Sequence, residues 1–254
     1  MSQATSKQQP YQGLAVIYDH VMRHVDYAEW VDYVDRLFKR FGERPARAVD
    51  LACGTGNATL ELARRGYTMT GTDASEAMLR VAREKALRQQ RDIPFCQFDL
   101  RQLDDLGPFD GAMCLYDSFN YLLTPTDLAL AFKAVHGTLK PGGLFIFDVC
   151  TQRNSLRYFS DKRDEEKGPG FISRRHSHYD QEQGLQFNHF EIRFADLEES
   201  LEETHSQRIY PLVELEAHIA DSPFELLDAF DGFTFRKASE EADRVHYVVR
   251  RPAS

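Results

Sequence analysis

Residues 50–59 read DLACGTGNAT, and this stretch decides the fold class. The run that leads into it, residues 46–53, is short and apolar and ends at a glycine, which is typical of a buried strand in a parallel sheet. Residues 57–65 then have the pattern of a helix that stops at Gly66. A glycine-rich turn between such a strand and a helix commonly lies beside a nucleotide-like ligand, because backbone amides can approach the ligand there.

Strand and helix patterns alternate from this turn to residue 149. The other expected strands are residues 67–72, 94–99, 109–116 and 144–149, and the other expected helices are residues 75–89 and 127–139. Short connections and right-handed crossovers then predict a doubly wound, mostly parallel α/β sheet. Ligands of such sheets bind outside the carboxyl ends of the strands.

The flanking regions have other patterns. Residues 11–41 have helical periodicity, and residues 160–170 (SDKRDEEKGPG) are charged and are expected to form a solvated loop. Residues 171–179, 185–194 and 198–210 alternate as in an antiparallel meander. Beyond them, the sequence predicts a helix at residues 211–219 and two strands at residues 226–235 and 244–250.

These patterns divide the chain into four parts. We expect an N-terminal helical lid (1–41), a ligand-binding core (42–150), an antiparallel β-insertion (151–210) over the site of a second substrate, and a C-terminal helix with strands (211–254). The C-terminal strands complete a seven-stranded sheet.

The composition is that of a globular protein, with 42% hydrophobic residues, 28% charged residues and a formal net charge of -9. This charge argues against broad binding to nucleic acid or anionic lipid, which requires clustered lysine and arginine. The four cysteines have no CxxC spacing and are expected to be buried thiols. The first ten residues, MSQATSKQQP, are expected to form a flexible tail and not a signal peptide. No run approaches the roughly 18 apolar residues of a membrane span, so we expect a cytoplasmic protein.

Acidic residues follow the glycine turn at the ends of the next two strands. Asp73 stands roughly 20 positions after Gly54, where a carboxylate can accept both hydroxyls of a ribose. Asp99 ends the third strand in FCQFDL, beside the expected place of an adenine ring. A dinucleotide fingerprint needs glycine or alanine at the third small position, and Thr59 stands there. A nicotinamide-dependent oxidoreductase is therefore disfavoured.

Five stretches together resemble the successive motifs of class I S-adenosylmethionine-dependent methyltransferases. They are VDLACGTGN, GTDASEAML, CQFDLRQL, FDGAMCLYDSFNYL and LKPGGLFIFDV, in the family's order over residues 46–150. The resemblance implies a Rossmann-like methyltransferase fold with S-adenosyl-L-methionine as the cofactor. Two more stretches, YQGLAVIYDHVM and ETHSQRIYPLVELEAHI, resemble a small-molecule subgroup that includes sugar N-methyltransferase-like proteins and carries a β-insertion after the fifth strand.

The resemblance also implies a set of cofactor contacts. Gly54 and Gly56 would let the backbone approach the methionine portion, and Asp50 would order the loop from the strand before it. Asp73 would bind the ribose, and Asp99 the adenine amino group. The other expected contacts are Ala52, Cys53 and Asn57 beside the loop, Ala74, Met78 and Leu100 beside the adenine, Leu115 and Tyr116 at the fourth strand's end, and Tyr11 in the lid. An acidic, aromatic pocket suits the cationic sulfonium.

The acceptor side is less well defined by the sequence. Methyl transfer is an in-line displacement that depends mainly on alignment, and a base is needed only where the nucleophile must lose a proton. YDSFN (116–120) replaces the Asn/Asp-Pro-Pro-aromatic motif of many base-methylating enzymes, which argues against a DNA adenine methyltransferase. Candidates for the acceptor site are Asp117, as base or amine anchor or merely a turn cap, its neighbour Asn120, and Tyr18, as a lid residue or plain core.

Further candidates lie in the insertion. In HSQRIY, alternation places Arg208 on the face opposite His205. Arg208 would bind an anionic group of the acceptor or form an ordinary surface ion pair. His176 and His178 point to one face and could ligate a metal with a third histidine, but no cysteine or carboxylate spacing supports such a site, and we expect no metal.

The sequence therefore predicts methyl transfer from S-adenosyl-L-methionine to a nitrogen or oxygen of a small-molecule acceptor. A tRNA or protein methyltransferase, and a cofactor-binding protein without turnover, remain alternatives. The sequence leaves the acceptor and the oligomeric state open.

Overall fold

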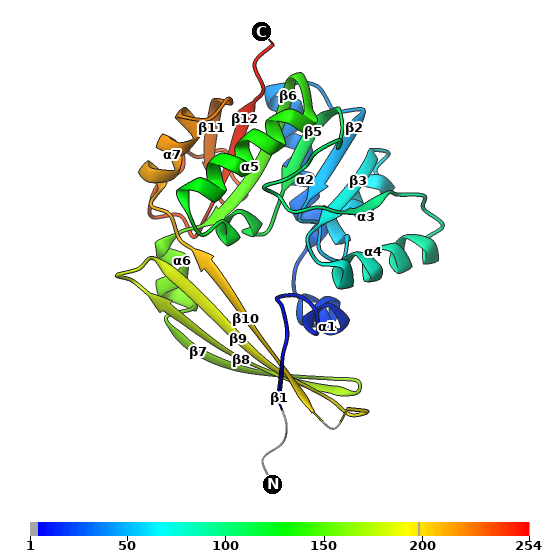
Figure 1. The fold of residues 1–254 in the computed structure, drawn as a ribbon. Helices are drawn as coiled ribbons and strands as arrows, with labels where there is room; N and C mark the ends of the chain where they lie inside the picture. Colours follow the sequence, from blue (N-terminus) through cyan, green and yellow to red (C-terminus); the bar gives the residue numbers. More distant parts are fainter. Residues whose placement is uncertain (1–4, 198, 254) are drawn as a thin grey trace.

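A computed structural model describes residues 5–197 and 199–253, which form two β-sheets (Figure 1). The main sheet has seven strands in the order β11-β12-β6-β5-β2-β3-β4. These strands are β2 (Arg47–Leu51), β3 (Thr68–Asp73), β4 (Phe95–Gln97), β5 (Phe109–Cys114), β6 (Leu139–Cys150), β11 (Glu225–Asp231) and β12 (Arg244–Arg250). Only the pairings of β12 with β6 and with β11 are antiparallel. The predicted doubly wound, mostly parallel sheet is confirmed.

Helices cover both faces of the main sheet. They are α2 (Tyr27–Phe41), α3 (Asn57–Arg64), α4 (Glu76–Arg88), α5 (Pro125–Thr138) and α7 (Leu212–Ala220). Successive side chains of β6 serve opposite faces: Phe145 and Phe147 pack with α5 and α7, whereas Leu144 and Ile146 pack with α2 and α3. The continuous apolar run of this strand therefore follows from its burial on both sides.

The second sheet is the predicted β-insertion, with two strands that the sequence analysis did not predict. Its order is β1-β10-β9-β8-β7, formed by β1 (Thr5–Lys7), β7 (Asp161–Gly168), β8 (Phe171–Asp180), β9 (Leu185–Phe194) and β10 (Ser200–Arg208). The short helix α6 (Gln152–Tyr158) leads into it from β6. Strands β7 to β10 pair in antiparallel fashion, and β1 runs parallel to β10.

Both additional strands correct sequence-based expectations. Residues 160–170 were expected to be a solvated loop, but β7 lies there, and its charges pair across to β8 through Arg174 with Glu165 and Arg175 with Asp164. Such cross-strand pairs allow a fully charged edge strand. The N-terminal tail was expected to be flexible, but its residues 5–7 form β1, because backbone pairing needs no apolar pattern.

The N-terminal helical region is divided between two places. Helix α1 (Leu14–Val21) contacts α4 and β7, and its Leu14 and Ile17 pack against the insertion side chains Phe171 and Ile192. In Figure 1, α1 lies between the main body and the insertion sheet. Helix α2 instead packs in the core, capped by the carboxylate of Asp26. This differs from the expectation of one lid over residues 1–41.

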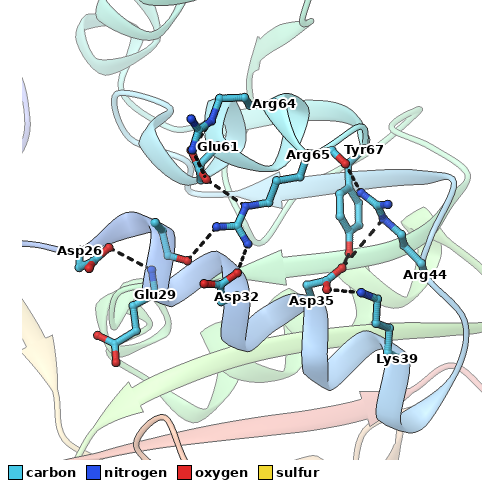
Figure 2. A network of polar contacts seen from close by, with 11 residues as sticks. Asp26, Glu29, Asp32, Asp35, Lys39, Arg44, Glu61, Arg64, Arg65 and Tyr67 are labelled. Carbon is cyan, nitrogen blue, oxygen red and sulfur yellow. Dashed lines mark hydrogen bonds and ion pairs between the residues drawn. The ribbon is translucent and has the colours of Figure 1, made fainter.

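Helix α2 is joined to α3 by polar contacts at the surface (Figure 2). Arg65 donates to Glu61 and forms an ion pair with Asp32. Tyr67 donates to Asp35 at 2.6 Å, under the guanidinium of Arg44. These contacts fix α2 against the carboxyl end of α3 and the start of β3.

Two boundaries near the site also differ from expectation. The fourth parallel strand ends at Cys114, because Tyr116 and Asp117 have φ angles of 64° and 53°. A 3₁₀ helix, η1 (Ser118–Tyr121), follows directly. The strand expected at residues 144–149 begins earlier, because β6 starts at Leu139. None of the described helices combines the length and apolar character needed to cross a bilayer.

Packing around Gly71 in β3 gives a test of the core beneath the site. A Cβ atom at this position would lie 2.6 Å from the ring of Phe95. We expect Gly71→Ala to lower the free energy of unfolding by about 1–3 kcal/mol, as overpacked cores do. The matched change Gly137→Ala, in α5 where a Cβ would meet nothing within 4 Å, should raise it by about 0.5–1 kcal/mol. Urea unfolding of both variants measures the difference, and equal effects would contradict this packing.

Candidate active site

A cavity of about 800 Å³ lies at the carboxyl ends of the parallel strands, beneath α1. Its lining includes every expected cofactor residue except Gly56: Tyr11, Asp50, Ala52, Cys53, Gly54, Asn57, Asp73, Ala74, Met78, Asp99, Leu100, Leu115 and Tyr116. It also includes Tyr18 and further residues that sequence reasoning missed, among them Thr55, Ser75 and Tyr121.

The glycine turn is a tight loop with three left-handed residues, Ala52 (φ 56°), Gly54 (φ 56°) and Gly56 (φ 78°). The two glycines have different surroundings. A Cβ at Gly54 would meet nothing within 4 Å, so this backbone borders open space. A Cβ at Gly56 would lie 3.1 Å from Ala82 and from the ring of Phe95. Gly56 therefore lets α3 begin close to α4, which differs from its expected contact with the cofactor.

The carboxylate of Asp73 closes this loop onto the next strand. Its Oδ2 accepts the N–H of Gly54, and its Oδ1 accepts the N–H of Ser75, both at 2.8 Å. The cap of α4 is Ser75, whose hydroxyl accepts the N–H of Met78. Because a carboxylate has about four lone-pair sites, Asp73 can still accept the hydroxyls of a ribose.

Beneath the loop, Asp50 is fully buried and accepts the hydroxyl of Thr59 at 2.5 Å. Thr59 occupies the third position of the glycine fingerprint, so its hydroxyl explains the departure from that fingerprint. Burial raises the pKa of Asp50 to about 7, and the hydrogen bond from Thr59 offsets this only in part.

The far end of the cavity is bordered by Asp99. Arg101 binds both oxygens of this carboxylate, at 2.8 and 2.6 Å, and thereby lowers its pKa. Asp99 therefore stays ionised and can accept a hydrogen bond from an amino group such as that of adenine.

Helix α1 is attached to the glycine loop by a latch, which we define as Asp19, Thr55, Asn57 and Lys85. Asp19 accepts the hydroxyl of Thr55 at 2.6 Å and the amide of Asn57 at 3.0 Å. Its other oxygen forms an ion pair with Lys85 at 2.7 Å. Burial opposes the charge on Asp19, but Lys85 and Thr55 outweigh it and lower the pKa.

Tyrosine rings line the end of the cavity between α1 and η1. Tyr11 lies edge-on to Tyr18, with centroids 6.1 Å apart, and its hydroxyl is 2.6 Å from that of Tyr121. Burial raises the pKa of Tyr11, Tyr18 and Tyr121, so all three phenols are neutral. The sequence signal for Tyr121 was its place directly after YDSFN.

The three polar acceptor candidates lie behind the cavity wall, which differs from expectation. Asp117 is bound by Arg244 at 2.8 Å and by Gln207 at 2.6 Å. Asn120 accepts the N–H of Cys150 at 2.9 Å and donates to the carbonyl of Arg208 at 2.7 Å.

The side chain of Arg208 lies against the ring of Tyr210, 5.2 Å from its centroid. As expected from alternation, His205 and Gln207 are on the buried face of β10. None of Asp117, Asn120 and Arg208 is among the cavity residues. Hydrogen bonds within the protein hold Asp117 and Asn120, whereas Nε of Arg208 is buried without a hydrogen-bond partner among the described residues.

The histidines of the insertion lie on two faces of its sheet. His176 pairs with Asp161 and His189 with Thr204, both on the exposed face, whereas His205 is buried and pairs with Glu203. Within residues 5–197 and 199–253, no group of three or more histidine, cysteine or acidic residues could hold a metal ion.

Comparisons with known proteins agree with this geometry. A methyltransferase-domain family model matches residues 48–143. The chain is 32% identical to the putative methyltransferase YqeM of Bacillus subtilis, over 95% of this chain and 97% of that protein. It is 29% identical to a dTDP-4-amino-2,3,4,6-tetradeoxy-D-glucose N,N-dimethyltransferase of Saccharopolyspora spinosa, over 94% and 88%. The structure of an S-adenosylmethionine-dependent methyltransferase of Clostridium acetobutylicum superposes with a TM-score of 0.81 at 27% identity, over 95% and 99%.

Asp50 gives the site a pH-dependent stability. Because its folded pKa of about 7 lies above its unfolded value of 3.8, its contribution is fully present below pH 4 and is lost as the pH rises through 7. Between pH 5 and pH 8 this loss is about 3 kcal/mol. We expect Asp50→Asn to flatten this decline, measured by urea unfolding of the free protein at both pH values. Parallel declines in wild type and variant would contradict the assignment.

The latch predicts a change in the rate of cofactor release. Asp19→Asn removes the ion pair with Lys85, which is worth about 1 kcal/mol for a partly exposed pair. We expect S-adenosylhomocysteine to dissociate about five-fold faster, measured by surface plasmon resonance. The control Asp35→Asn breaks a similar ion pair with Lys39 on α2 and should leave the rate unchanged. An unchanged rate in Asp19→Asn would show that α1 does not retain the ligand.

Proposed function

This chain belongs to the family of S-adenosylmethionine-dependent methyltransferases, and we propose that it methylates an amino nitrogen of a small polar acceptor. Bound S-adenosyl-L-methionine supplies an electrophilic methyl group. The residues suited to hold this cofactor are Gly54 and Asp73 at its methionine and ribose portions and Asp99 at the adenine.

The single observation that carries the proposal is the tyrosine-walled end of the cavity. Its walls come from α1, from η1 and from the strand ends, and the insertion sheet lies behind α1. A cavity of about 800 Å³ falls within the range of small-molecule sites. It suits a nucleoside-sized cofactor with a small acceptor.

An amine fits the chemistry of these walls better than an alcohol. The ring faces of Tyr11, Tyr18 and Tyr121 favour a cationic ammonium group, and their neutral phenol oxygens can accept hydrogen bonds from it. An alcohol must lose a proton as it reacts, whereas a neutral amine attacks with its free electron pair and needs no base in the transfer step.

The relatives support the same class of acceptor. The Saccharopolyspora protein, which aligns over most of this chain, is named for N,N-dimethylation of a nucleotide-linked amino sugar. The net charge of -9 also disfavours a tRNA acceptor, since phosphate binding depends on clustered cations.

The test is an acceptor panel read by mass spectrometry. The purified protein is incubated with S-adenosyl-L-methionine and nucleotide-linked amino sugars, free amino sugars, glycine, unmodified tRNA or a peptide mixture. We expect a one-methyl mass increase on an amino sugar, located on nitrogen by fragmentation.

The matched control replaces the amino group of the reactive sugar with a hydroxyl and should give no product. Excess S-adenosylhomocysteine should abolish the signal. Methylation of tRNA or peptide alone, or equal methylation of the hydroxyl sugar, would contradict the proposal.

A further inference from the structure

We propose that Tyr11, Tyr121, His205 and Glu203 form a proton relay that removes a proton from the protonated acceptor amine before it is methylated. The relay rests on the proposed function, because it needs an acceptor that enters as an ammonium ion. It extends from the cavity wall into the insertion sheet, away from the cofactor loop.

The four groups form a continuous chain of contacts. The hydroxyls of Tyr11 and Tyr121 are 2.6 Å apart, and the hydroxyl of Tyr121 is 3.0 Å from Nδ1 of His205. Nε2 of His205 is 3.2 Å from the carboxylate of Glu203. Only the two tyrosines line the cavity, whereas the side chains of His205 and Glu203 are 2% and 0% exposed.

The charge on Glu203 determines which group donates and which accepts in each hydrogen bond of the relay. Its carboxylate accepts the backbone N–H groups of Tyr11, Gly13 and Leu14, where α1 begins. Burial opposes its charge, but the hydrogen bond from His205 and that from the N–H of Leu14 lower its pKa below the usual range. An ionised Glu203 can only accept, so Nε2 of His205 donates to it. In the neutral form of an imidazole that donates from Nε2, Nδ1 is free to accept a proton.

The same reasoning assigns the donors and acceptors in the hydrogen bonds between His205 and the cavity. Because Nδ1 accepts, Tyr121 donates its hydroxyl proton to His205, and its oxygen accepts the hydroxyl proton of Tyr11. The phenol oxygen of Tyr11 is thereby left with lone pairs and without a further proton to donate. A group that enters the cavity beside it must donate, which an ammonium ion does.

The proton transfer balances without any other reactant. The ammonium N–H bond breaks, and its proton forms an O–H bond on Tyr11, whose own proton passes to Tyr121. The proton of Tyr121 passes to Nδ1 of His205, so an imidazolium forms beside the carboxylate of Glu203. The amine keeps its electron pair and is neutral, and both tyrosines are neutral again.

Other polar residues that are buried on the same face of the insertion sheet pair without charge, so packing on this face does not require an ionised group. Ser177 donates to Asn188 at 2.7 Å, and Gln186 donates to Gln207 at 3.0 Å. Both pairs are buried and neutral. The buried carboxylate of Glu203, with His205 beside it, is therefore an exception on this face, and a buried carboxylate is stabilising only where it has such hydrogen-bond partners.

The charges around the relay favour its protonated state. The ionisable groups that act on the two tyrosines are Asp117 and Asp73, together with Tyr18. Phe190 packs against the ring of His205, with centroids 5.2 Å apart. The charges among these groups are negative, so they stabilise an imidazolium more than a phenolate.

The first experiment is a pH profile of kcat/KM with the amino sugar that the panel identifies. We expect Tyr121→Phe and His205→Gln each to lower kcat/KM at pH 7 by roughly 100-fold, as loss of a general base does. The deficit should shrink toward pH 9.5, because the neutral amine is then present in solution. His189→Gln, a change of an exposed histidine on the next strand, is the matched control and should keep the wild-type profile.

Cofactor binding separates this effect from damage to the fold. Calorimetry should show that both relay variants bind S-adenosylhomocysteine within about three-fold of wild type. A deficit that stays the same from pH 7 to pH 9.5, or no deficit, would overturn the relay.

A second readout does not depend on an acceptor. In the complex with S-adenosylhomocysteine at pH 7.5, ¹⁵N NMR of labelled histidine should show His205 as the Nε2–H form, assigned by its loss in His205→Gln. The Nδ1–H form would overturn the relay even if the panel succeeds. If no amine is methylated, the proposed function fails and the relay with it, whereas a methylated amine with the Nδ1–H form overturns the relay alone.

Discussion

The carboxylate of Asp73 is the contact on which the cofactor end of the molecule depends. Its two oxygens hold the N–H groups of Gly54 and Ser75, and thus join the loop after β2 to the start of α4. Ser75 in turn donates its hydroxyl to the carbonyl of Tyr11 at 3.0 Å. A single acidic side chain therefore shapes the glycine loop and places the N-terminal segment over the cavity. Parallel pairing of β2 with β3 brings these groups together.

In the insertion sheet, a second buried carboxylate, that of Glu203, also binds backbone N–H groups of another segment. It binds three backbone N–H groups around the start of α1, where the helix dipole favours a negative charge. Helix α1 is thus held by Glu203 at one end and by Asp19 in the latch at the other. This arrangement explains how the insertion sheet, far from the glycine loop in sequence, helps to place α1 beside the cavity.

The parts of the site that the sequence predicted are those encoded locally. Gly54 and Asp73 act through a turn and a strand end whose residues are close in the chain, so spacing alone indicated them. Asp117 and Asn120 could not be interpreted in this way, because their partners Arg244 and Cys150 become neighbours only after the sheet has formed. Strand β1 was missed for the same reason, since its pairing with β10 is a backbone contact between distant segments.

A calorimetric measurement of S-adenosylhomocysteine binding to Asp73→Ala tests the central claim most directly. A hydrogen bond to a charged group is worth about 1.5–3 kcal/mol, so the variant should bind about 10- to 100-fold more weakly than wild type. Asp221→Ala, a matched change at the end of α7, should bind as wild type does. Equal affinity in Asp73→Ala, with its fold intact by circular dichroism, would contradict the role given to this carboxylate and the cofactor site built around it.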